Sequence, residues 1–423
     1  CPDHTQLYGL RESRGLEEIL RDSFSMRIAL IADAYPPLRS SGAVQLRDLS
    51  QEFARQGHEI TVIVPSAQMG SPWTLEVLDG VQVLGVKAMQ TRDTGYVRRT
   101  LAELALSYFV RKGLQASPLR NTKWDAVVWY SPTIFFGSVV GWLKKKSACP
   151  SYLIIRDIFP EWAVDLGLMS RGPVYRFFKF FERLQYSVAD TVAVQSPSGL
   201  PYFAEWSKQP GRSLEVLQNW LAPAHNVGCV INVADTPLAG RRIFVYAGNM
   251  GAAQGMDMVL GLAERLKART DVGFLLVGRG SDVQRLRGLA DEKQLGNVCF
   301  HDEIDPTEVP GLLAQCHVGL VMLDPRHKTH NVPGKFLTYM QAGLPVLARI
   351  NSGNDLCDLI AQEGVGRAYV GDSVEAFAEL GLALCESSDR DLMAEKARAL
   401  AQSLYSSQAA VEQIVRNLTA RVV

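Results

Sequence analysis

The chain has 423 residues, which is enough for two or three domains with full hydrophobic cores. It is 47% hydrophobic and 21% charged, as globular proteins are, and its formal net charge of zero argues against a general nucleic-acid-binding protein. Residues 26–222 nevertheless hold 22 Lys and Arg against 16 Asp and Glu, which leaves room for a local anionic partner such as a membrane surface.

Neither a disulfide framework nor a membrane-spanning segment is predicted. No two of the seven cysteines form a C-x-x-C or another ligand spacing, so we interpret them as reduced thiols of a cytoplasmic protein. No apolar run reaches 18 residues. Residues 1–25 lack the apolar core of a signal peptide, and we treat them as a tag or leader that precedes Met26, or else as a loosely attached helix.

The first predicted unit is strand–helix–strand. Residues 27–33 form an apolar run typical of a buried parallel strand, and a helix at about 43–56 leads to a second strand at 59–64. The G-x-G-x-x-G fingerprint of dinucleotide binding is absent here. Ser41 and Gly42 stand where the helix begins, and either turn chemistry or a ligand explains them.

Polar residues follow a later strand of the same series. Strands are predicted at 81–86 and 126–130, with a helix at 96–116 between them, and a further strand is predicted at 151–162. The C-terminal end of that strand carries Arg156, Asp157 and Glu161. Ligands of open α/β sheets bind beyond the carboxyl ends of the strands, so these groups are candidates for a site. Alternatively, Asp157 caps the next helix and Arg156 pairs with it.

Residues 171–187 predict an unusual helix in which aromatic and cationic residues alternate around nearly the whole surface. This mixture is typical of helices that lie in a membrane interface, although helical aromatics are more commonly core residues. The aromatics are Tyr175, Phe177, Phe178, Phe180 and Phe181, and the cations are Arg171, Arg176, Lys179 and Arg183. Strands at 190–194 and 214–217 complete this half, and the Pro- and Gly-rich stretch 223–240 is predicted to be a linker.

A second α/β series follows the linker. Strands are predicted at 243–249, 273–277, 298–301, 317–323, 346–348 and 367–370, with helices between several of them. Two series in sequence predict two Rossmann-like, doubly wound α/β domains that face a cleft. We expect an acceptor-binding, membrane-facing domain at 26–222, a nucleotide-sugar-binding domain at 241–400, and a helix at 401–423 that packs back toward the first domain.

Residues 331–354 contain the clearest candidate for anion binding. Asn331 and Pro333 predict the start of a helix, and Gly343 its end. Lys335 then lies on the first turn, beside the positive end of the helix dipole, which favours a phosphate. A solvated lysine on an ordinary helix is the alternative.

Several strings in order resemble the GT-B glycosyltransferases of family 4, from Met26 to the C-terminus. They are YPPLRSSG (35–42), YAGNMGAAQG (246–255), VGRG (277–280) and PGKFLTYMQAGLPVLA (333–348). RDIFPEWAVDLGL (156–168), LQYSVAD (184–190), VQSP (194–197) and NVPGKFLTYMQAGLPVL (331–347) further resemble bacterial O-antigen and capsule transferases that move N-acetyl-L-fucosamine or a related deoxy-amino sugar.

This resemblance implies a donor site that is mostly on the second domain. Backbone N–H groups near Gly248 and Lys335 would bind the diphosphate, and residues after strand 346–348 would bind sugar hydroxyls. The implied donor-binding residues are Ser41, Gly42, Gly248, Asn249, Met250, Gln254, Gly278, Arg279, His330, Asn331, Pro333, Gly334, Lys335, Thr338, Asn351, Gly353 and Asn354. The implied acceptor or membrane residues are Tyr130, Arg156, Arg176, Phe177, Lys179 and Phe180.

The chain departs from the family at its catalytic motifs. The Glu-x7-Glu pair falls on His330 and Thr338, and Gln254 replaces the lysine that usually meets the pyrophosphate. The histidine of the first domain aligns near Tyr130. These changes direct attention to Asp157 and Glu161, either of which could deprotonate an acceptor hydroxyl.

The sequence therefore predicts transfer of a sugar from a UDP-sugar to a polyprenyl-diphosphate-linked acceptor, in O-antigen or capsule biosynthesis. The protein would act on the inner face of the cytoplasmic membrane, without metal, cofactor or nucleic acid. Two other hypotheses remain open at this point. One is a UDP-sugar 2-epimerase, and the other is a non-catalytic protein that binds nucleotide-sugars.

Overall fold

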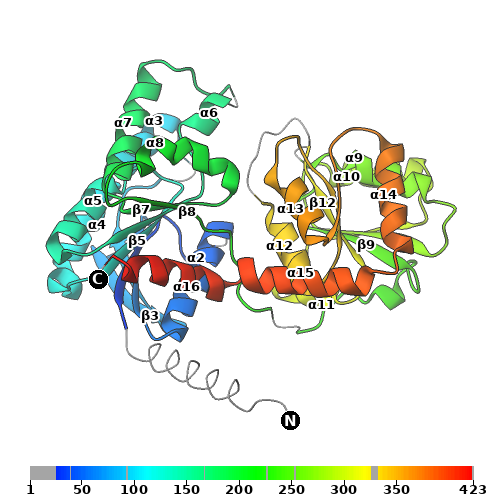
Figure 1. The fold of residues 1–423 in the computed structure, drawn as a ribbon, viewed down its shortest axis with the longest axis horizontal. Helices are drawn as coiled ribbons and strands as arrows, with labels where there is room; N and C mark the ends of the chain where they lie inside the picture. The colour runs from blue at the N-terminus through cyan, green and yellow to red at the C-terminus, as the bar shows by residue number, and fades with distance from the viewer. Residues whose placement is uncertain are drawn as a thin grey trace, which may run out of the picture. The chain divides into compact units, whose positions relative to one another are not determined.

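A computed structural model describes residues 25–38, 40–91, 94–165, 167–224, 227–251, 254–324 and 332–421. The chain divides into two compact units (Figure 1). Unit 1 runs to Val194 and adds Tyr202–Leu217 and the residues from Val411 onward. Unit 2 comprises Gln195–Pro201 and Gln218–Ala410. The segment Gln195–Pro201 therefore belongs to unit 2 although its neighbours on both sides belong to unit 1.

Unit 1 is built on one eight-stranded sheet in the order β3-β4-β2-β1-β5-β6-β7-β8. All neighbouring pairs are parallel except β3 and β4. The strands are β1 Arg27–Ile31, β2 Glu59–Ser66, β3 Trp73–Leu78, β4 Val81–Lys87, β5 Ala126–Ser131, β6 Ser151–Ile155, β7 Thr191–Val194 and β8 Ser213–Val216. β5, β6 and β7 are buried along their whole length, as expected of parallel strands that are covered on both faces.

The connections of unit 1 are mostly helical, and three of its elements differ from prediction. The helices are α2 Ser41–Arg55, α3 Tyr96–Leu104, α4 Leu106–Ala116, α5 Gly137–Ser147, α6 Glu161–Asp165, α7 Pro173–Ser187 and α8 Ala204–Ser207, with the 3-10 turn η1 Pro118–Asn121. A second 3-10 turn, η2 Pro197–Phe203, begins in the segment assigned to unit 2 and ends in unit 1. The strand predicted at 151–162 ends at Ile155, and α6 begins at Glu161. The single helix predicted at 96–116 is two helices that meet at Ala105. β3 was not predicted, although its sequence alternates apolar and polar residues as a half-buried strand does.

Unit 2 contains a six-stranded, fully parallel sheet in the order β11-β10-β9-β12-β13-β14. The strands are β9 Arg242–Ala247, β10 Val272–Val277, β11 Val298–His301, β12 Val318–Met322, β13 Val346–Arg349 and β14 Gly366–Tyr369. Along β9, Ile243 and Val245 pack into one hydrophobic cluster while Phe244 and Tyr246 pack into another. Because alternate side chains point to opposite faces, the sheet has a core on each side.

Helices cover both of these cores. They are α9 Asp257–Arg265, α10 Val283–Glu292, α11 Val309–Leu313, α12 Gly334–Ala342, α13 Asp355–Glu363, α14 Val374–Glu386 and α15 Arg390–Leu404, and α16 Ser407–Thr419 follows. The stretch 223–240, predicted as a linker, contributes the buried Ile231, Val233 and Leu238 to the core of unit 2. In α16, the side chain of Gln413 donates to the carbonyl of Val216 in β8 at 2.9 Å. No helix within the described ranges is both long and apolar enough to cross a bilayer.

Candidate functional site

The helix mouth predicted around Lys335 is present in unit 2. Pro333 is the N-cap of α12, and Lys335 is the second residue of the helix. Gly343 ends the helix in the left-handed conformation, with φ 72°. A Cβ there would lie 2.1 Å from Nη1 of Arg398, so both backbone and packing require glycine. The predicted start and end of this helix are confirmed.

The Lys335 ammonium lies in an enclosed place with an aromatic neighbour. Its Nζ is 4.9 Å from the ring centroid of Tyr246. A Cβ on Gly248 would come within 2.7 Å of Lys335 Cε, so the absence of a side chain at Gly248 makes room for the lysine. Among the described residues no carboxylate forms an ion pair with Lys335, and burial lowers its pKa. A bound anion would compensate the ammonium for the solvation by water that it has lost on burial.

A cavity of about 220 Å³ adjoins this lysine at the carboxyl edge of the sheet. Ile304, Pro306 and Val309 give it an apolar wall, and Thr338 lies on the same side of α12 as Lys335. Glu303 also lines the cavity and forms an exposed ion pair with Arg279 at 3.3 Å. The cavity therefore combines an apolar wall with a cation, which suits a ligand that has both a planar ring and an anionic group.

The loops after β9 and β10 correct part of the predicted donor set. The N–H of Gly248 donates to Val277 O at 2.8 Å, and the N–H of Met250 donates to Arg279 O at 2.7 Å. These two N–H groups are thus not available to a phosphate, which leaves Asn249 of the predicted three. The two loops can approach this closely only because Gly278 has no side chain. A Cβ at that position would be 2.0 Å from Gly248 O. Gly278 is therefore a packing residue of the site.

The side chain of Gln254, predicted to contact the donor, instead forms hydrogen bonds within its own loop. Its Oε1 accepts from the N–H of Gly251 at 2.9 Å and from Nδ2 of Asn249 at 3.1 Å, which closes the loop after β9. Thr338 Oγ1 donates to Gly334 O within the helix at 3.1 Å. His330 and Asn331 lie outside the described residues.

In the predicted sugar-binding loop after β13, the two asparagine side chains form hydrogen bonds within the loop and to the start of α13. Asn351 and Asn354 are each 3% exposed, and Nδ2 of Asn354 donates to Oδ1 of Asn351 at 3.3 Å. Asn354 is the N-cap of α13 and accepts from the N–H of Leu356. Gly353 between them has φ 76°. The loop presents its backbone and Gly353 more openly than either asparagine side chain.

In unit 1, Arg156 joins residues that the sequence analysis selected separately. Its guanidinium donates to Tyr130 Oη at 2.6 Å, to Ser41 Oγ at 3.0 Å and to Gln45 Oε1 at 3.1 Å. Burial is the main reason why the pKa of Tyr130 rises to about 12. Gly42 lies against the same group, with Arg156 Nη1 and Tyr130 Cε1 each 3.5 Å from the place of a Cβ.

Asp157 and Glu161, the predicted bases, have different surroundings. Asp157 is exposed at the end of β6, where desolvation by nearby protein raises its pKa and Arg156 opposes that shift. Glu161 accepts hydrogen bonds from Tyr175 at 2.7 Å, Lys179 at 3.0 Å and Tyr202 at 3.2 Å. Burial works to raise the pKa of Glu161, but these bonds together lower it. Asp157 is thus the carboxylate that is open to a substrate.

Of the predicted membrane residues, some are exposed and one is held in ion pairs inside unit 1. Phe177 and Phe180 are 39% and 63% exposed, and Arg176 is exposed beside them. The Lys179 side chain is only 16% exposed and forms ion pairs with Glu161 and Glu182. Lys179 therefore points into unit 1 and not toward a membrane, which corrects its assignment.

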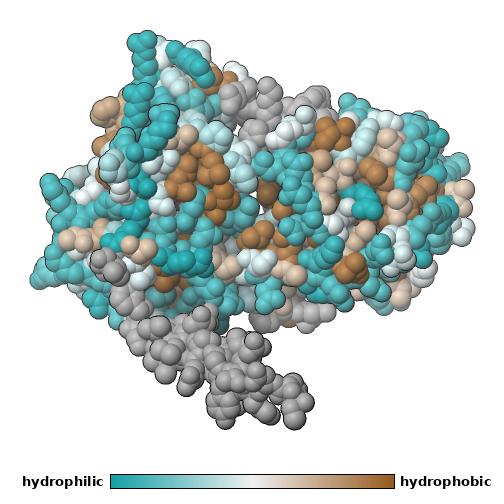
Figure 2. All heavy atoms as spheres, in the orientation of Figure 1, coloured by the Kyte–Doolittle hydropathy of each residue, from teal (hydrophilic) through white to brown (hydrophobic). Residues whose placement is uncertain are grey.

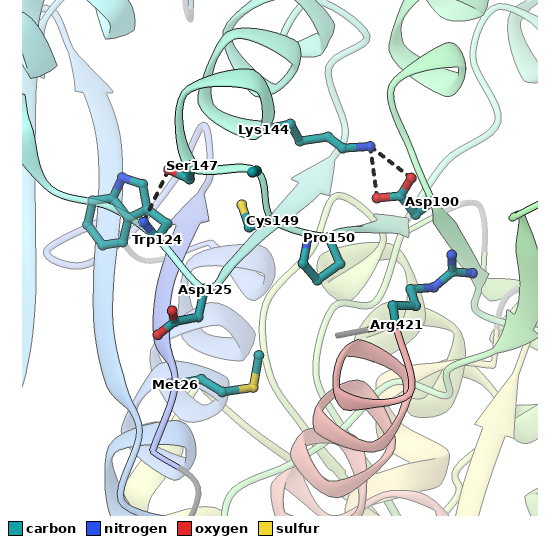
Figure 3. A pocket seen from close by; sticks show the side chains of 10 residues that line it. Met26, Trp124, Asp125, Lys144, Ser147, Cys149, Pro150, Asp190 and Arg421 are labelled. Atoms are coloured by element: carbon teal, nitrogen blue, oxygen red, sulfur yellow. Dashed lines mark hydrogen bonds and ion pairs between the residues drawn. The ribbon is translucent and has the colours of Figure 1, made fainter. Parts of the chain in front are cut away.

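A second cavity, of about 520 Å³, lies at the opposite, amino end of the unit 1 sheet (Figure 3). Its carboxylates serve the fold: Asp125 accepts from the N–H of Arg27, and Asp190 accepts from the N–H of Ser151 and pairs with Lys144 at 2.8 Å. Burial raises the pKa of Cys149 to about 11, so its thiol is protonated. No signal in the sequence pointed to this cavity.

Metal ligation has no candidate group in the part of the chain that the structure describes. No three His, Cys, Asp or Glu side chains come together there. The expectation that no metal or cofactor takes part stays a prediction.

Comparison with known proteins shows that both units match glycosyltransferase families. Residues 41–220 match the model of a glycosyl transferase 4-like domain, and residues 241–387 match that of glycosyl transferases group 1. The chain is 27% identical over 269 residues to "Probable glycosyltransferase WbjE" of Pseudomonas aeruginosa, a match that covers 62% of this chain and 66% of that protein, just under two thirds. It is 25% identical to "Putative colanic acid biosynthesis glycosyl transferase WcaI" of Escherichia coli (strain K12), over 69% of this chain and 76% of that protein.

Solved structures agree with the predicted fold. Anabaena HepE in complex with UDP and glucose aligns with TM-score 0.63 and 14% identity, over 93% of this chain and all of that chain. WaaG, a glycosyltransferase involved in lipopolysaccharide biosynthesis, aligns with TM-score 0.61 and 17% identity, over 93% and 99%. The prediction of a GT-B fold with two Rossmann-like domains is confirmed.

Proposed function

Because the chain belongs to the group 1 glycosyltransferases, we propose that it transfers a sugar from a UDP-sugar to a lipid-linked acceptor in the synthesis of a surface polysaccharide. The sugar that we propose is N-acetyl-L-fucosamine or a related deoxy-amino sugar, and the polysaccharide is an O-antigen or capsule. The descriptions of WbjE and WcaI support this class of pathway.

One observation carries the proposal: Lys335 is a partly buried cation at a helix N-terminus with no carboxylate partner among the described residues. The ammonium and the dipole of α12 both favour a diphosphate at this end of the cavity. Ile304, Pro306 and Val309 then offer an apolar wall to the base. Anabaena HepE, which shares this fold and was crystallised with UDP, supports the choice of uracil.

In the proposed reaction, an acceptor hydroxyl attacks C1 of the donor sugar while the bond from C1 to the diphosphate oxygen breaks. The proton of that hydroxyl passes to the carboxylate of Asp157, which is exposed at the carboxyl edge of the unit 1 sheet. Arg156 favours the ionised, proton-accepting form of Asp157. The negative charge of the leaving diphosphate is stabilised by Lys335 and α12.

The acceptor that we propose is a polyprenyl-diphosphate sugar at the inner face of the cytoplasmic membrane. The exposed Phe177 and Phe180 on α7, with Arg176 beside them, support membrane contact, because such residues favour the interface between headgroups and acyl chains.

A panel of UDP- and GDP-sugars tests the proposal, first for binding and then for transfer to lipid-linked acceptors. We expect a UDP-sugar to bind and to turn over only when acceptor is present. GDP-sugars are included because a relative with 24% identity is described as GDP-mannose-dependent. Epimer formation without acceptor would indicate an epimerase, and tight UDP binding without any transfer would indicate a non-catalytic binding protein.

Two matched substitutions separate the carboxylates of unit 1. We expect Asp157→Asn to lower kcat by about 100-fold or more, the usual loss when a general base is removed. Glu161→Gln keeps a hydrogen-bond acceptor for Tyr175 and Tyr202, so its kcat should stay within a few-fold of wild type while its Tm falls. Full activity of Asp157→Asn would show that the base lies elsewhere.

A further inference from the structure

The positive charge of the first half of the chain is concentrated in one short region. Residues 26–222 hold 22 Lys and Arg and 16 Asp and Glu, a surplus of six. Residues 106–147 alone hold seven cations and one acid, Asp125, which is the same surplus of six. The rest of this half is therefore balanced at 15 of each sign.

The structure places six of these cations on α4, η1 and α5 and in the loop that follows η1. We call them the basic surface: Arg111, Lys112, Arg120, Lys123, Lys145 and Lys146. Lys146 is half-buried and the other five are exposed or half-buried at the surface of unit 1. Figure 2 shows mainly hydrophilic residues on the side of unit 1 where Figure 1 labels α4 and α5.

Within the described residues, no carboxylate forms an ion pair with a cation of the basic surface. In unit 2, by contrast, exposed cations such as Arg265, Arg285 and Lys293 each form an ion pair with a carboxylate. On the basic surface the cations contact aromatic rings and main-chain carbonyls. Arg111 and Lys146 lie 5.1 and 5.3 Å from the ring of Trp142, and Lys123 donates to the carbonyl of Lys146.

These contacts hold like charges close together. Burial and the nearby Lys123 lower the pKa of Lys146. Such an arrangement costs free energy in the isolated protein, and an anionic partner would offset that cost. α5, which carries Trp142 and Lys145, packs against both α4 and α7. The apolar side chains Phe177, Phe180 and Leu184 are exposed on α7.

We propose that the basic surface binds the headgroups of anionic phospholipids. A bilayer presents negative phosphates beside an apolar phase, which matches cations on α4 and α5 next to exposed aromatics on α7. A nucleic-acid duplex would complement the cations but not the apolar residues, because its bases are stacked inside the helix. This inference rests on the proposed membrane association and deepens it, because it names the lipid charge and the residues that respond to it.

Co-sedimentation with vesicles tests the inference. We expect the full chain to bind vesicles of phosphatidylcholine with one third phosphatidylglycerol, and to bind pure phosphatidylcholine at least tenfold more weakly. In the triple variant Arg111→Gln, Lys112→Gln, Lys145→Gln, partitioning into the anionic vesicles should fall about 100-fold, since each cation near such a surface adds about tenfold or less. The matched control Lys208→Gln, Lys267→Gln, Lys396→Gln changes the net charge equally and should bind as wild type does.

Equal binding to both vesicle types, or equal loss in both triple variants, would overturn the inference. Binding to RNA with no binding to anionic vesicles would also overturn it and indicate a nucleic-acid partner. A circular dichroism melt at the wild-type temperature ensures that the variant is folded. Transfer to a water-soluble acceptor analogue separates the two proposals: it should be unchanged in the variant, and its absence in the wild type would count against the reaction but not against lipid binding.

Discussion

Lys179 of unit 1 and Lys335 of unit 2 are both partly buried lysines on helices, and they differ in what surrounds their ammonium groups. Lys179 pairs with two carboxylates, those of Glu161 and Glu182, and its Nζ donates to the hydroxyl of Tyr202 at 2.6 Å. Lys335 has the ring of Tyr246 as its aromatic neighbour and no ion pair within the described part of the chain.

The difference teaches how to separate a structural cation from a binding one. Burying a charge is costly unless partners compensate it. In the network of Lys179 the partners belong to the protein itself, so the cation stabilises the packing of α6, α7 and η2. At Lys335 compensation is incomplete, so the fold holds a place for an anion from outside. Substitutions at the two lysines test whether this distinction is real.

The largest effect is expected for Lys179→Met, which leaves Glu161 and Glu182 without their cation. Removing one partner of a buried ion pair costs about 3–5 kcal/mol. We expect a fall in Tm of about 10 °C for unit 1 in thermal denaturation. Lys208→Met is the matched control, because Lys208 and Glu205 form the same i,i+3 pair with side chains that are 69% and 85% exposed.

The control should change stability by less than about 1 kcal/mol, as exposed pairs do. UDP affinity should be unchanged in both variants at temperatures where they are folded. If Lys179→Met melts like Lys208→Met, the network around Glu161 does not hold unit 1 together, and Glu161 again becomes a candidate base.

Lys335→Met should have the next largest effect, on binding and not on stability. The methionine keeps the apolar stem over Tyr246 and removes the charge. Charge-assisted contacts are worth about 1.5–3 kcal/mol, so the Kd for UDP should rise about 10- to 100-fold in calorimetry. Because the folded protein lowers the pKa of Lys335, removing its charge should leave Tm unchanged or raise it. An unchanged Kd for UDP, or a large loss of stability, would show that Lys335 is a structural cation like Lys179 and not a binding one.

The sequence predicted the fold and the helix mouth better than it predicted the partners of individual groups. Parallel strands such as β5 and helix ends such as Gly343 leave local patterns, and both appeared as expected. Whether Lys179 pairs with Glu161, or whether the N–H of Met250 already has an acceptor, depends on segments brought together only by folding. A single sequence carries no local pattern for such long-range contacts.

Two further elements were missed or misjudged. β3 is an edge strand in which Trp73, Leu75 and Val77 alternate with Thr74 and Glu76, a local strand pattern that was overlooked. The stretch 223–240 contains the turn residues of a linker, yet Ile231, Val233 and Leu238 are buried in unit 2. Composition indicated an irregular backbone there but gave no information about where that backbone packs.

Gly248→Ala should have a smaller effect than removal of the lysine. Gly248 has φ 138°, which L-residues rarely adopt, and the new Cβ would be 2.7 Å from Lys335 Cε. We expect a loss of about 1–3 kcal/mol in stability and a UDP Kd about fivefold higher, because the lysine must move. Gly42→Ala is the control: its neighbours lie at 3.5 Å, and its stability should stay within about 0.5 kcal/mol of wild type. Equal effects of the two substitutions would argue against tight packing at Lys335.

The smallest effect concerns pH, and it tests the state of Lys335 directly. Burial lowers the pKa of this lysine in the free protein, and a diphosphate binds its protonated form. As pH rises, the free lysine loses its proton earlier than an exposed lysine would, and binding must then include proton uptake. Between about pH 7 and pH 10, the wild-type Kd for UDP should therefore rise a few-fold, with proton uptake visible in calorimetry in buffers of different ionisation enthalpy. Lys335→Met should show neither change. A wild-type Kd that is flat over this range would mean that the ammonium is solvated like that of any surface lysine, and the contrast with Lys179 would then lose its physical basis.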